Sequence, residues 1–116
     1  MEKLYDKSLT ELHDLLVSKE ITAVDLTEET LNRIQDTEEQ LGSFITVSEE
    51  KAMALAKAID LKGITESNPL AGIPIGIKDN IVTKDILTTA GSKMLHNFDP
   101  IYDATVMDKV YQADMI

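Results

Sequence analysis

The chain of 116 residues has no cysteine, so it holds neither a disulfide framework nor a metal site built on thiolates. Aromatic residues make up only 4% of it, and the core therefore has to be built from Leu, Ile, Val, Ala and Met. No apolar run approaches the roughly 20 residues of a membrane-spanning helix, and the opening MEKLYDKSLTEL lacks the layout of a signal peptide. We expect a cytoplasmic protein with one hydrophobic core.

Positive charge is also scarce, with 11 Lys and Arg residues against 21 Asp and Glu residues and a formal net charge of −10. Arg33 is the only arginine, and the lysines are scattered along the chain. Affinity for nucleic acid depends on Lys and Arg side chains that neutralise phosphates, so direct binding of DNA or RNA is disfavoured. An acidic surface is common in soluble domains and needs no functional explanation.

The residues that would hold a cofactor are equally few. His13 and His96 are the only histidines, and they lie far apart with no second histidine beside either. A zinc site needs three or four such ligands, so we expect no metal site. The sequence also has no glycine-rich phosphate loop, so we expect no nucleotide cofactor in this chain.

The first half of the chain, residues 1–62, has the pattern of helices. Ser8 and Glu11 have the spacing of a capping box ahead of leucines that recur at helical period. Thr22 and Asp25 repeat that spacing at the start of a second apolar stripe. These signals predict two helices, and such stripes and caps are structural by default.

Three further boundaries follow in this half. The second helix is expected to run to about Thr37, and residues 44–47 are a short aromatic and β-branched run that predicts a strand. Ser48 is predicted to cap a third helix, and Glu49 and Glu50 suit the positive end of that helix. Residues 62–68 are polar and turn-prone, and we interpret them as a loop.

The most informative stretch is residues 69–80, which read PLAGIPIGIKDN. Isoleucines alternate with small residues and one lysine at a period of two, which is the pattern of a strand. The small residues ahead of the lysine leave room for backbone or substrate to approach closely. The alternating residues are Ile73, Pro74, Ile75, Gly76, Ile77 and Lys78.

The rest of the second half, residues 69–116, predicts a mixed α/β arrangement. Residues 81–83 either prolong the lysine strand or start a hairpin toward residues 86–88. A helix is expected over residues 103–113, and residues 114–116 begin like a buried strand. The fold class predicted is α/β, with amino-terminal helices followed by a mixed sheet, all within one domain piece of residues 1–116.

Lys78 allows two readings. A lysine held in a dry niche loses its proton more easily, because desolvation favours the neutral amine, and it can then act as a base. A lysine at the end of a strand more often lays its stem along apolar surface and keeps its charge in water. Asp79 is either its partner or simply the first residue of a turn.

The run PLAGIPIGIKDNIVTKDILTTAGSKML, residues 69–95, resembles the opening signature of the amidase family. Helices before it and the DATVMDKV helix after it follow in family order, so the resemblance covers nearly the whole chain. It implies a partial amidase-signature fold and the cleavage of carboxamides by a Ser-cisSer-Lys triad. Lys78 matches the lysine that acts as base through the middle serine.

The same resemblance implies a set of pocket residues. Asp79 and Asn80 follow the lysine directly, and Gly91 and Ser92 belong to a small-residue turn that lies near the active site in the family. For Gly91 and Ser92 the alternative is a tight turn that needs small residues for its own geometry.

The sequence departs from the family in its serines. Family members carry a Gly- and Ser-rich segment downstream of the lysine that supplies the nucleophile and the middle serine, and nothing like it is present here. None of the serines lies in a glycine-rich turn suited to an oxyanion hole. We therefore expect an amino-terminal fragment that is inactive alone. The serines are Ser8, Ser18, Ser43, Ser48, Ser67 and Ser92.

Within the family the likeness is to the A subunits of glutamyl-tRNA(Gln) amidotransferases, carried by residues 8–34 and 100–116. This implies glutamine hydrolysis to ammonia for the ATP-dependent transamidation of Glu-tRNA(Gln) to Gln-tRNA(Gln). It also implies partner B and C subunits, with tRNA held mainly by a partner and ATP and Mg on a partner. Two alternatives stay open: a general small-amide hydrolase, and a helical interaction module without chemistry.

Overall fold

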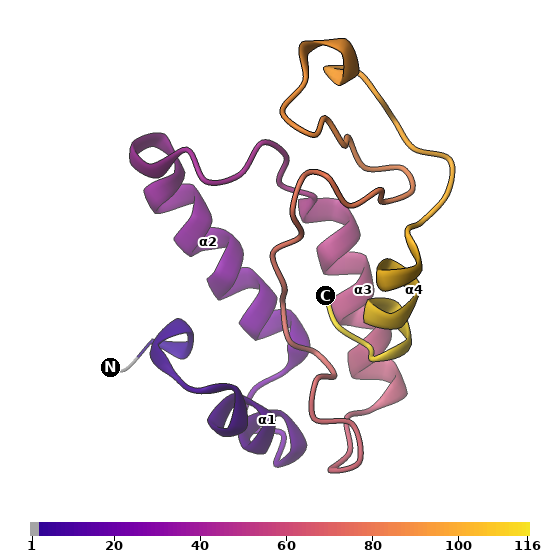
Figure 1. The fold of residues 1–116 in the computed structure, drawn as a ribbon. Helices are drawn as coiled ribbons and strands as arrows, with labels where there is room; N and C mark the ends of the chain where they lie inside the picture. The colour runs from indigo at the N-terminus through magenta and orange to yellow at the C-terminus, as the bar shows by residue number, and fades with distance from the viewer. Residues whose placement is uncertain (1–2) are drawn as a thin grey trace.

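The computed structural model describes residues 3–116, whose regular structure is helical (Figure 1). In the view of Figure 1, α2 lies on one side and α3 and α4 on the other, the segment around residues 70–78 runs between them, and the chain that follows it forms a loop region above. The elements are η1 (Leu4–Asp6), α1 (Leu9–Val17), α2 (Ala23–Leu41), α3 (Glu49–Lys62), η2 (Lys93–Leu95) and α4 (Thr105–Gln112).

Both predicted capping boxes are confirmed. At the start of α1, the backbone N–H of Glu11 donates to the Ser8 hydroxyl, and the Ser8 N–H donates to the Glu11 carboxylate over 2.7 Å. At the start of α2, Asp25 N–H donates to Thr22 Oγ1 over 3.0 Å and Thr22 N–H donates to Asp25 Oδ2 over 2.8 Å. Each box satisfies two N–H groups that would otherwise lack partners.

The other helix boundaries differ in detail from the predicted ones. The second helix, α2, continues past Thr37 to Leu41, because Gly42 adopts the left-handed conformation (φ 58°) that ends a helix, and its N–H reaches the Glu38 carbonyl. The third helix begins after Ser48 as predicted, although the Ser48 side chain makes no capping hydrogen bond. The last helix, α4, is shorter than the predicted range of 103–113.

A carboxylate from α3 joins α3 to α2. Asp60 Oδ1 accepts a hydrogen bond from Ala23 N–H over 2.8 Å, and its Oδ2 accepts one from Val24 N–H over 3.0 Å. Ala23 and Ala56 are fully buried beside Ile59, and these small side chains let the two helices approach closely. Asp60 therefore caps the N-terminus of a helix other than its own.

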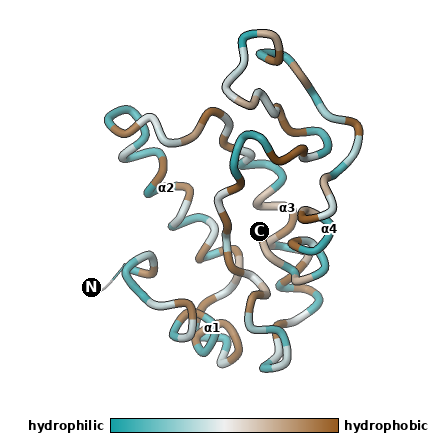
Figure 2. The backbone as a smooth tube through the Cα atoms, in the orientation of Figure 1, coloured by the Kyte–Doolittle hydropathy of each residue, from teal (hydrophilic) through white to brown (hydrophobic). Residues whose placement is uncertain are grey.

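The main core lies where α1, α2 and the extended segment 70–78 meet. Leu12, Leu16, Leu26 and Ile73 form a buried cluster, so Ile73 anchors the extended segment in the core. Its neighbour Gly72 has φ 76°, and a methyl group there would lie 2.8 Å from the side chain of Ile64. A side chain at this position would strain the backbone and require Ile64 to move, which favours glycine where the segment passes over α1 and α2. Figure 2 shows that hydrophobic residues recur along the helices and along this segment.

The predicted mixed sheet is wrong, because residues 3–116 contain no β-strand. Residues 44–47, 73–78, 81–83, 86–88 and 114–116 are irregular or extended, and the described chain is all-helical in its regular structure. The period-two pattern of residues 73–78 produces extended backbone, but a strand also needs a hydrogen-bonded neighbour along its length.

Only the beginning of such pairing is present. Ile75 N–H donates to the Ile116 carbonyl over 2.8 Å, and Ile116 N–H donates to the Ile73 carbonyl over 3.0 Å. These two bonds flank Pro74 in the pattern of a parallel pair, and Gly72 N–H adds a bond to the Asp114 carbonyl over 2.8 Å. The carboxyl-terminal residues consequently lie beside the extended segment (Figure 1).

Within residues 3–116, none of the helices combines the length and the apolar character needed to cross a membrane.

Candidate functional site

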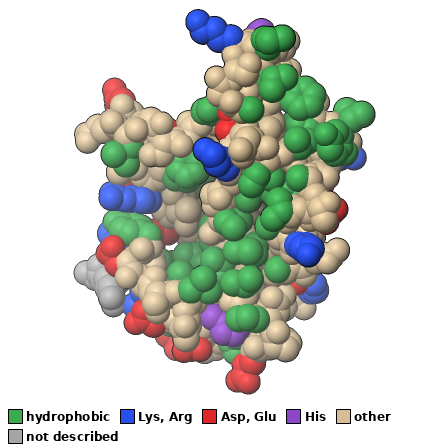
Figure 3. All heavy atoms as spheres, in the orientation of Figure 1, with side chains coloured by type: hydrophobic (Ala, Val, Ile, Leu, Met, Phe, Trp, Pro, Cys, Tyr) green, Lys and Arg blue, Asp and Glu red, His purple; other side chains and the backbone are tan. Residues whose placement is uncertain are grey.

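The extended segment forms one wall of a hollow of about 450 Å³, whose other walls come from α2, α3, α4, the loop after α2 and residues 79–88. Figure 3 shows hydrophobic side chains gathered in the central part of this face. Charged side chains are rare in the lining. Its charged residues are Lys51, Lys78 and Asp79. Apolar lining residues include Ile34, Phe44, Leu55, Ile75, Ile86 and Val110.

Lys78 lies in the wall of this hollow and is exposed. Within residues 3–116 its amine has no hydrogen bond and no ion pair. The described residues therefore do not form a dry niche around it. A lysine acts as a base near neutral pH when burial or a neighbouring positive charge favours its neutral form.

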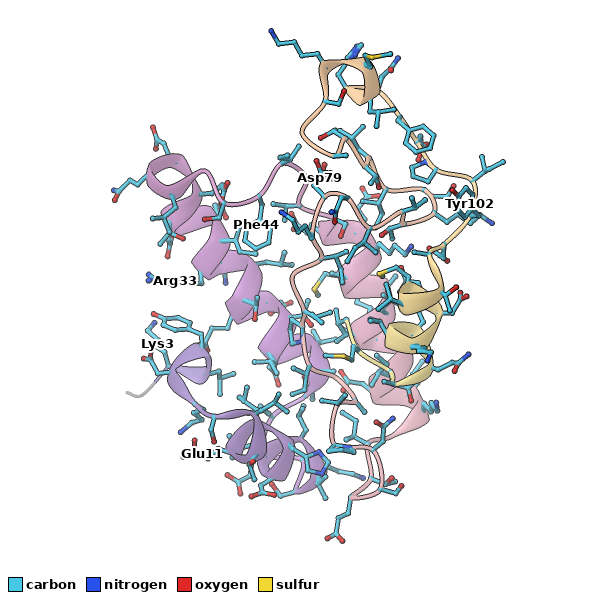
Figure 4. The ribbon with its side chains drawn as sticks, in the orientation of Figure 1. Lys3, Glu11, Arg33, Phe44, Asp79 and Tyr102 are labelled. Carbon is cyan, nitrogen blue, oxygen red and sulfur yellow. The ribbon has the colours of Figure 1, made fainter. Side chains whose placement is uncertain are left out.

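Asp79 is engaged away from the amine of its neighbour. Its carboxylate accepts hydrogen bonds from the Thr89 hydroxyl, from Thr89 N–H over 2.9 Å and from Gly91 N–H over 3.3 Å. The bonds from Thr89, then the bond from Gly91 and the charge of Lys78, hold the pKa of Asp79 below its ordinary value. Figure 4 shows Asp79 at the edge of the loop region, beyond the end of the extended segment.

The small-residue turn predicted at residues 88–92 is present. Ala90 (φ 49°) and Gly91 (φ 67°) are both left-handed, and Ser92 N–H donates to the Thr89 carbonyl over 2.8 Å, as in a type I′ turn. Left-handed backbone costs a non-glycine residue such as Ala90 about 1–2 kcal/mol. This turn therefore needs support from its surroundings.

The remaining predicted pocket residues lie outside the lining of the hollow, which does not include Asn80, Gly91 or Ser92. The Ser92 hydroxyl instead accepts a hydrogen bond from Met94 N–H over 3.2 Å at the start of η2. Their role in a substrate pocket stays a prediction.

Three residues of this region were not predicted to belong to the site. Thr89 is the main partner of Asp79, ten positions away. Phe44, which Figure 4 shows on the loop after α2, lies so close to the extended segment that a methyl group at Gly76 would be 3.7 Å from its ring. Lys51 of α3 lies 5.1 Å from the ring centre of Tyr111 and donates to the Lys84 carbonyl over 3.3 Å. Of the three, only Phe44 carried a signal in the sequence, its apolar aromatic side chain.

The two histidines stay apart from this site. In the described part of the chain, no group of three or more His, Cys, Asp or Glu side chains is placed to hold a metal ion. His96 lies beside η2, with Nδ1 3.0 Å from the Lys93 carbonyl oxygen.

A family model described as Amidase matches residues 25–116. The chain belongs to the amidase family. The A subunit of a glutamyl-tRNA(Gln) amidotransferase from Streptococcus mutans serotype c is 59% identical over 110 residues, and its counterpart from Streptococcus pyogenes serotype M5 is 60% identical over 110 residues. Each alignment covers 95% of this amidase chain but 22% of the relative, so the chain spans about a fifth of the length of these relatives.

Solved structures agree with this membership. A chain of a complex described as vestigial and as revealing the origins of an s-triazine catabolic enzyme matches with a TM-score of 0.86 and 28% identity, over 95% of this chain and 25% of its own. An amidase family protein from Bacillus anthracis matches with a TM-score of 0.84 and 25% identity, over 96% of this chain and 22% of its own. The arrangement of helices and extended segments described here is thus that of the corresponding part of these two larger proteins.

Proposed function

We propose that this chain supplies the lysine-bearing part of an amidotransferase A subunit, which hydrolyses glutamine to ammonia for the ATP-dependent conversion of Glu-tRNA(Gln) to Gln-tRNA(Gln). The observation that carries the proposal is the place of Lys78, unpaired in the wall of an apolar hollow, in a chain 59% identical to such subunits. A lysine committed to an ion pair would resist giving up its charge, whereas this amine is available.

In the proposed mechanism the neutral Lys78 amine takes a proton from a middle serine, which takes one from the nucleophilic serine. The nucleophile attacks the carboxamide carbon of glutamine, and the C–N bond breaks as ammonia leaves with a returned proton. Water then hydrolyses the acyl-enzyme to glutamate and restores the serine. Both serines would come from the part of the relatives that this chain does not span.

The same part of the relatives would provide the cover over Lys78. The hollow presents mostly apolar side chains, including Ile75, Ile86 and Phe44, and Ile75 and Phe44 are each about 40% exposed. Covering such a surface buries apolar area and removes water from the amine, and desolvation favours the neutral form that a base requires.

The decisive experiment replaces Lys78 with methionine in the full-length protein and measures ammonia release from glutamine. Loss of a general base lowers kcat by about 10²–10⁴-fold. Lys57→Met is the matched control, because Lys57 is an exposed lysine of α3 outside the hollow. Near-normal ammonia release by the Lys78 variant would contradict the assignment.

The proposal includes B and C partner subunits, a partner that holds the tRNA and a partner that binds ATP with Mg, and a cytoplasmic location.

The structural similarity to the amidase family protein from Bacillus anthracis favours a second candidate, a general small-amide hydrolase. Copurification with two other subunits, together with ATP-dependent transamidation of Glu-tRNA(Gln), supports the first. A lone polypeptide that hydrolyses small amides without ATP supports the second.

A further inference from the structure

Asp79 holds three consecutive residues of the 88–92 turn. Its carboxylate binds the N–H and hydroxyl of Thr89 and the N–H of Gly91, and its backbone carbonyl accepts the N–H of Ala90 over 2.8 Å. Hydrogen bonds to an ionised carboxylate are roughly twice as strong as those between neutral groups. The left-handed pair Ala90 and Gly91, of which Ala90 is strained, is therefore held from outside the turn by Asp79, and Gly91 N–H also donates to Thr89 Oγ1 over 3.2 Å within it.

The clamped turn is bonded to the residue directly after Lys78. The Lys78 carbonyl also accepts a hydrogen bond from Ile81 N–H over 3.0 Å, so the backbone on the carboxyl side of the lysine is closed into a turn of its own. On the amino side, Ile75 N–H and Ile73 C=O are bonded to Ile116. The short stretch that carries Lys78 is thus held at both ends.

We propose that Asp79 is a positioning residue: by clamping the 88–92 turn through Thr89 and Gly91, it fixes the backbone of Lys78 and hence the direction in which the amine enters the hollow. This inference rests on the proposed function, in which Lys78 is the base. It differs from the sequence prediction that Asp79 lines a substrate pocket, because its carboxylate oxygens are engaged by the turn.

The clamp also occupies the hydrogen-bonding oxygens of the carboxylate next to the lysine. An opposite charge that pairs with an amine favours its protonated form. Three donors from the turn face the Asp79 oxygens, and no ion pair joins Asp79 to Lys78 in residues 3–116. The Asp79 oxygens are thus engaged by the turn, while the charges of Asp79 and Lys78 still interact through space.

The test compares Thr89→Val with Thr89→Ser in the full-length protein, assayed with its partner subunits for ammonia release from glutamine. Valine removes the hydroxyl that donates to Asp79 and accepts from Gly91 N–H, and serine keeps it. We expect Thr89→Val to lower kcat about 10- to 100-fold, because a misplacement of about 1 Å has that effect. The KM for glutamine should change by less than roughly twofold, and Thr89→Ser should restore most of kcat.

The matched control is Thr65→Val. Thr65 also lies in a loop and its hydroxyl is bonded to another side chain, that of Ser67 at 2.8 Å, but it is outside the hollow. This variant should keep wild-type kcat. Rates are expressed per folded molecule, with the folded fraction taken from urea unfolding of each variant.

A second measurement does not depend on activity. Asp79→Asn places an amide where Gly91 N–H needs an acceptor, so hydrogen exchange of the peptide across residues 88–92 should accelerate by about tenfold or more, while peptides of α2 stay unchanged. Wild-type kcat in Thr89→Val, or unchanged exchange in Asp79→Asn, would overturn the clamp. Activity retained by Lys78→Met would overturn the proposed function instead, whatever the exchange result.

Discussion

Asp79 accepts hydrogen bonds from both the backbone N–H and the hydroxyl of Thr89, ten residues further along the chain. This relationship ties the residue after the lysine to a turn whose Ala90 is left-handed. It also leaves the amine of Lys78 without a carboxylate partner in residues 3–116. One side chain thereby orders a strained turn and leaves a neighbouring cation unpaired.

Arginine at position 78 separates a base from a fixed positive charge. A guanidinium stays protonated at any pH that proteins tolerate, so Lys78→Arg keeps the charge but cannot accept a proton. We expect glutamine hydrolysis by the full-length protein to fall by about 10²-fold or more, as with other lost general bases. Steady-state ammonia release measures this, and substantial activity in the arginine variant would mean that Lys78 acts through its charge.

Gly72 is predicted to be intolerant of a side chain. A Cβ there would lie 2.8 Å from Ile64 Cδ1 and 3.2 Å from Ala23 Cβ, in a backbone conformation with φ 76°. Gly72→Ala should lower the free energy of unfolding by about 2–4 kcal/mol, from backbone strain together with overpacking. Urea unfolding followed by circular dichroism measures the loss.

Gly42→Ala is the control for that substitution. Gly42 also has positive φ, 58°, but a Cβ there meets nothing within 4 Å. Its cost should be only the backbone strain of about 1 kcal/mol. Equal losses in the two variants would show that the contact with Ile64 is not what constrains Gly72.

Asp60 should stabilise the pairing of α2 with α3. Asp60→Ala removes both acceptors of the Ala23 and Val24 N–H groups and is expected to cost about 1–3 kcal/mol of unfolding free energy. Asp14→Ala, at an exposed position of α1, should change stability by less than about 0.5 kcal/mol. A difference within error between the two variants in urea unfolding would show that Asp60 does not stabilise the helix pair.

Acid should destabilise the fold through carboxylates whose pKa is lowered by hydrogen bonds. The Ser8 bonds lower the pKa of Glu11, the Thr22 bonds lower that of Asp25, and the Thr89 bonds lower that of Asp79. A group with a lower pKa in the folded state stabilises it fully above its ordinary pKa near 4, and this contribution is lost as pH falls through the folded value.

The corresponding measurement is the urea midpoint across pH 7 to 2. These three groups should leave it unchanged down to about pH 5 and lower it below about pH 4. Asp25→Asn and Thr22→Val each disrupt the same cap, so both should be less stable at neutral pH and show a shallower acid limb. An acid limb as steep as that of the parent chain in both variants would contradict the assignment to Asp25.

The sequence predicted what is encoded locally. The capping boxes of α1 and α2 need residues only three apart, Ser8 with Glu11 and Thr22 with Asp25, and both are present. The cap that Asp60 provides joins residues 37 and 36 positions apart, and no sequence pattern signals it. The same holds for Thr89 as partner of Asp79.

The predicted strands failed for a related reason. Alternation along residues 73–78 correctly indicates extended backbone, but a strand also needs a neighbouring strand along its length. Within residues 3–116, the pairing bonds of this extended segment are those to residues 114–116. At the site, the alternation placed Lys78 at the end of the extended segment, and its role as base stays a prediction. The predicted burial of the Lys78 amine is not provided by residues 3–116, which leave Lys78 exposed in the wall of the hollow.

The bonds of Ile73 and Ile75 to Ile116 bear on the order of events during synthesis. Helices α1 to α3 depend on contacts between nearby residues and can form as soon as they leave the ribosome. The stretch that presents Lys78 has to wait until about forty more residues have emerged, since its register is set by the last of them. A nascent chain can thus form these helices before the register of this extended segment is set.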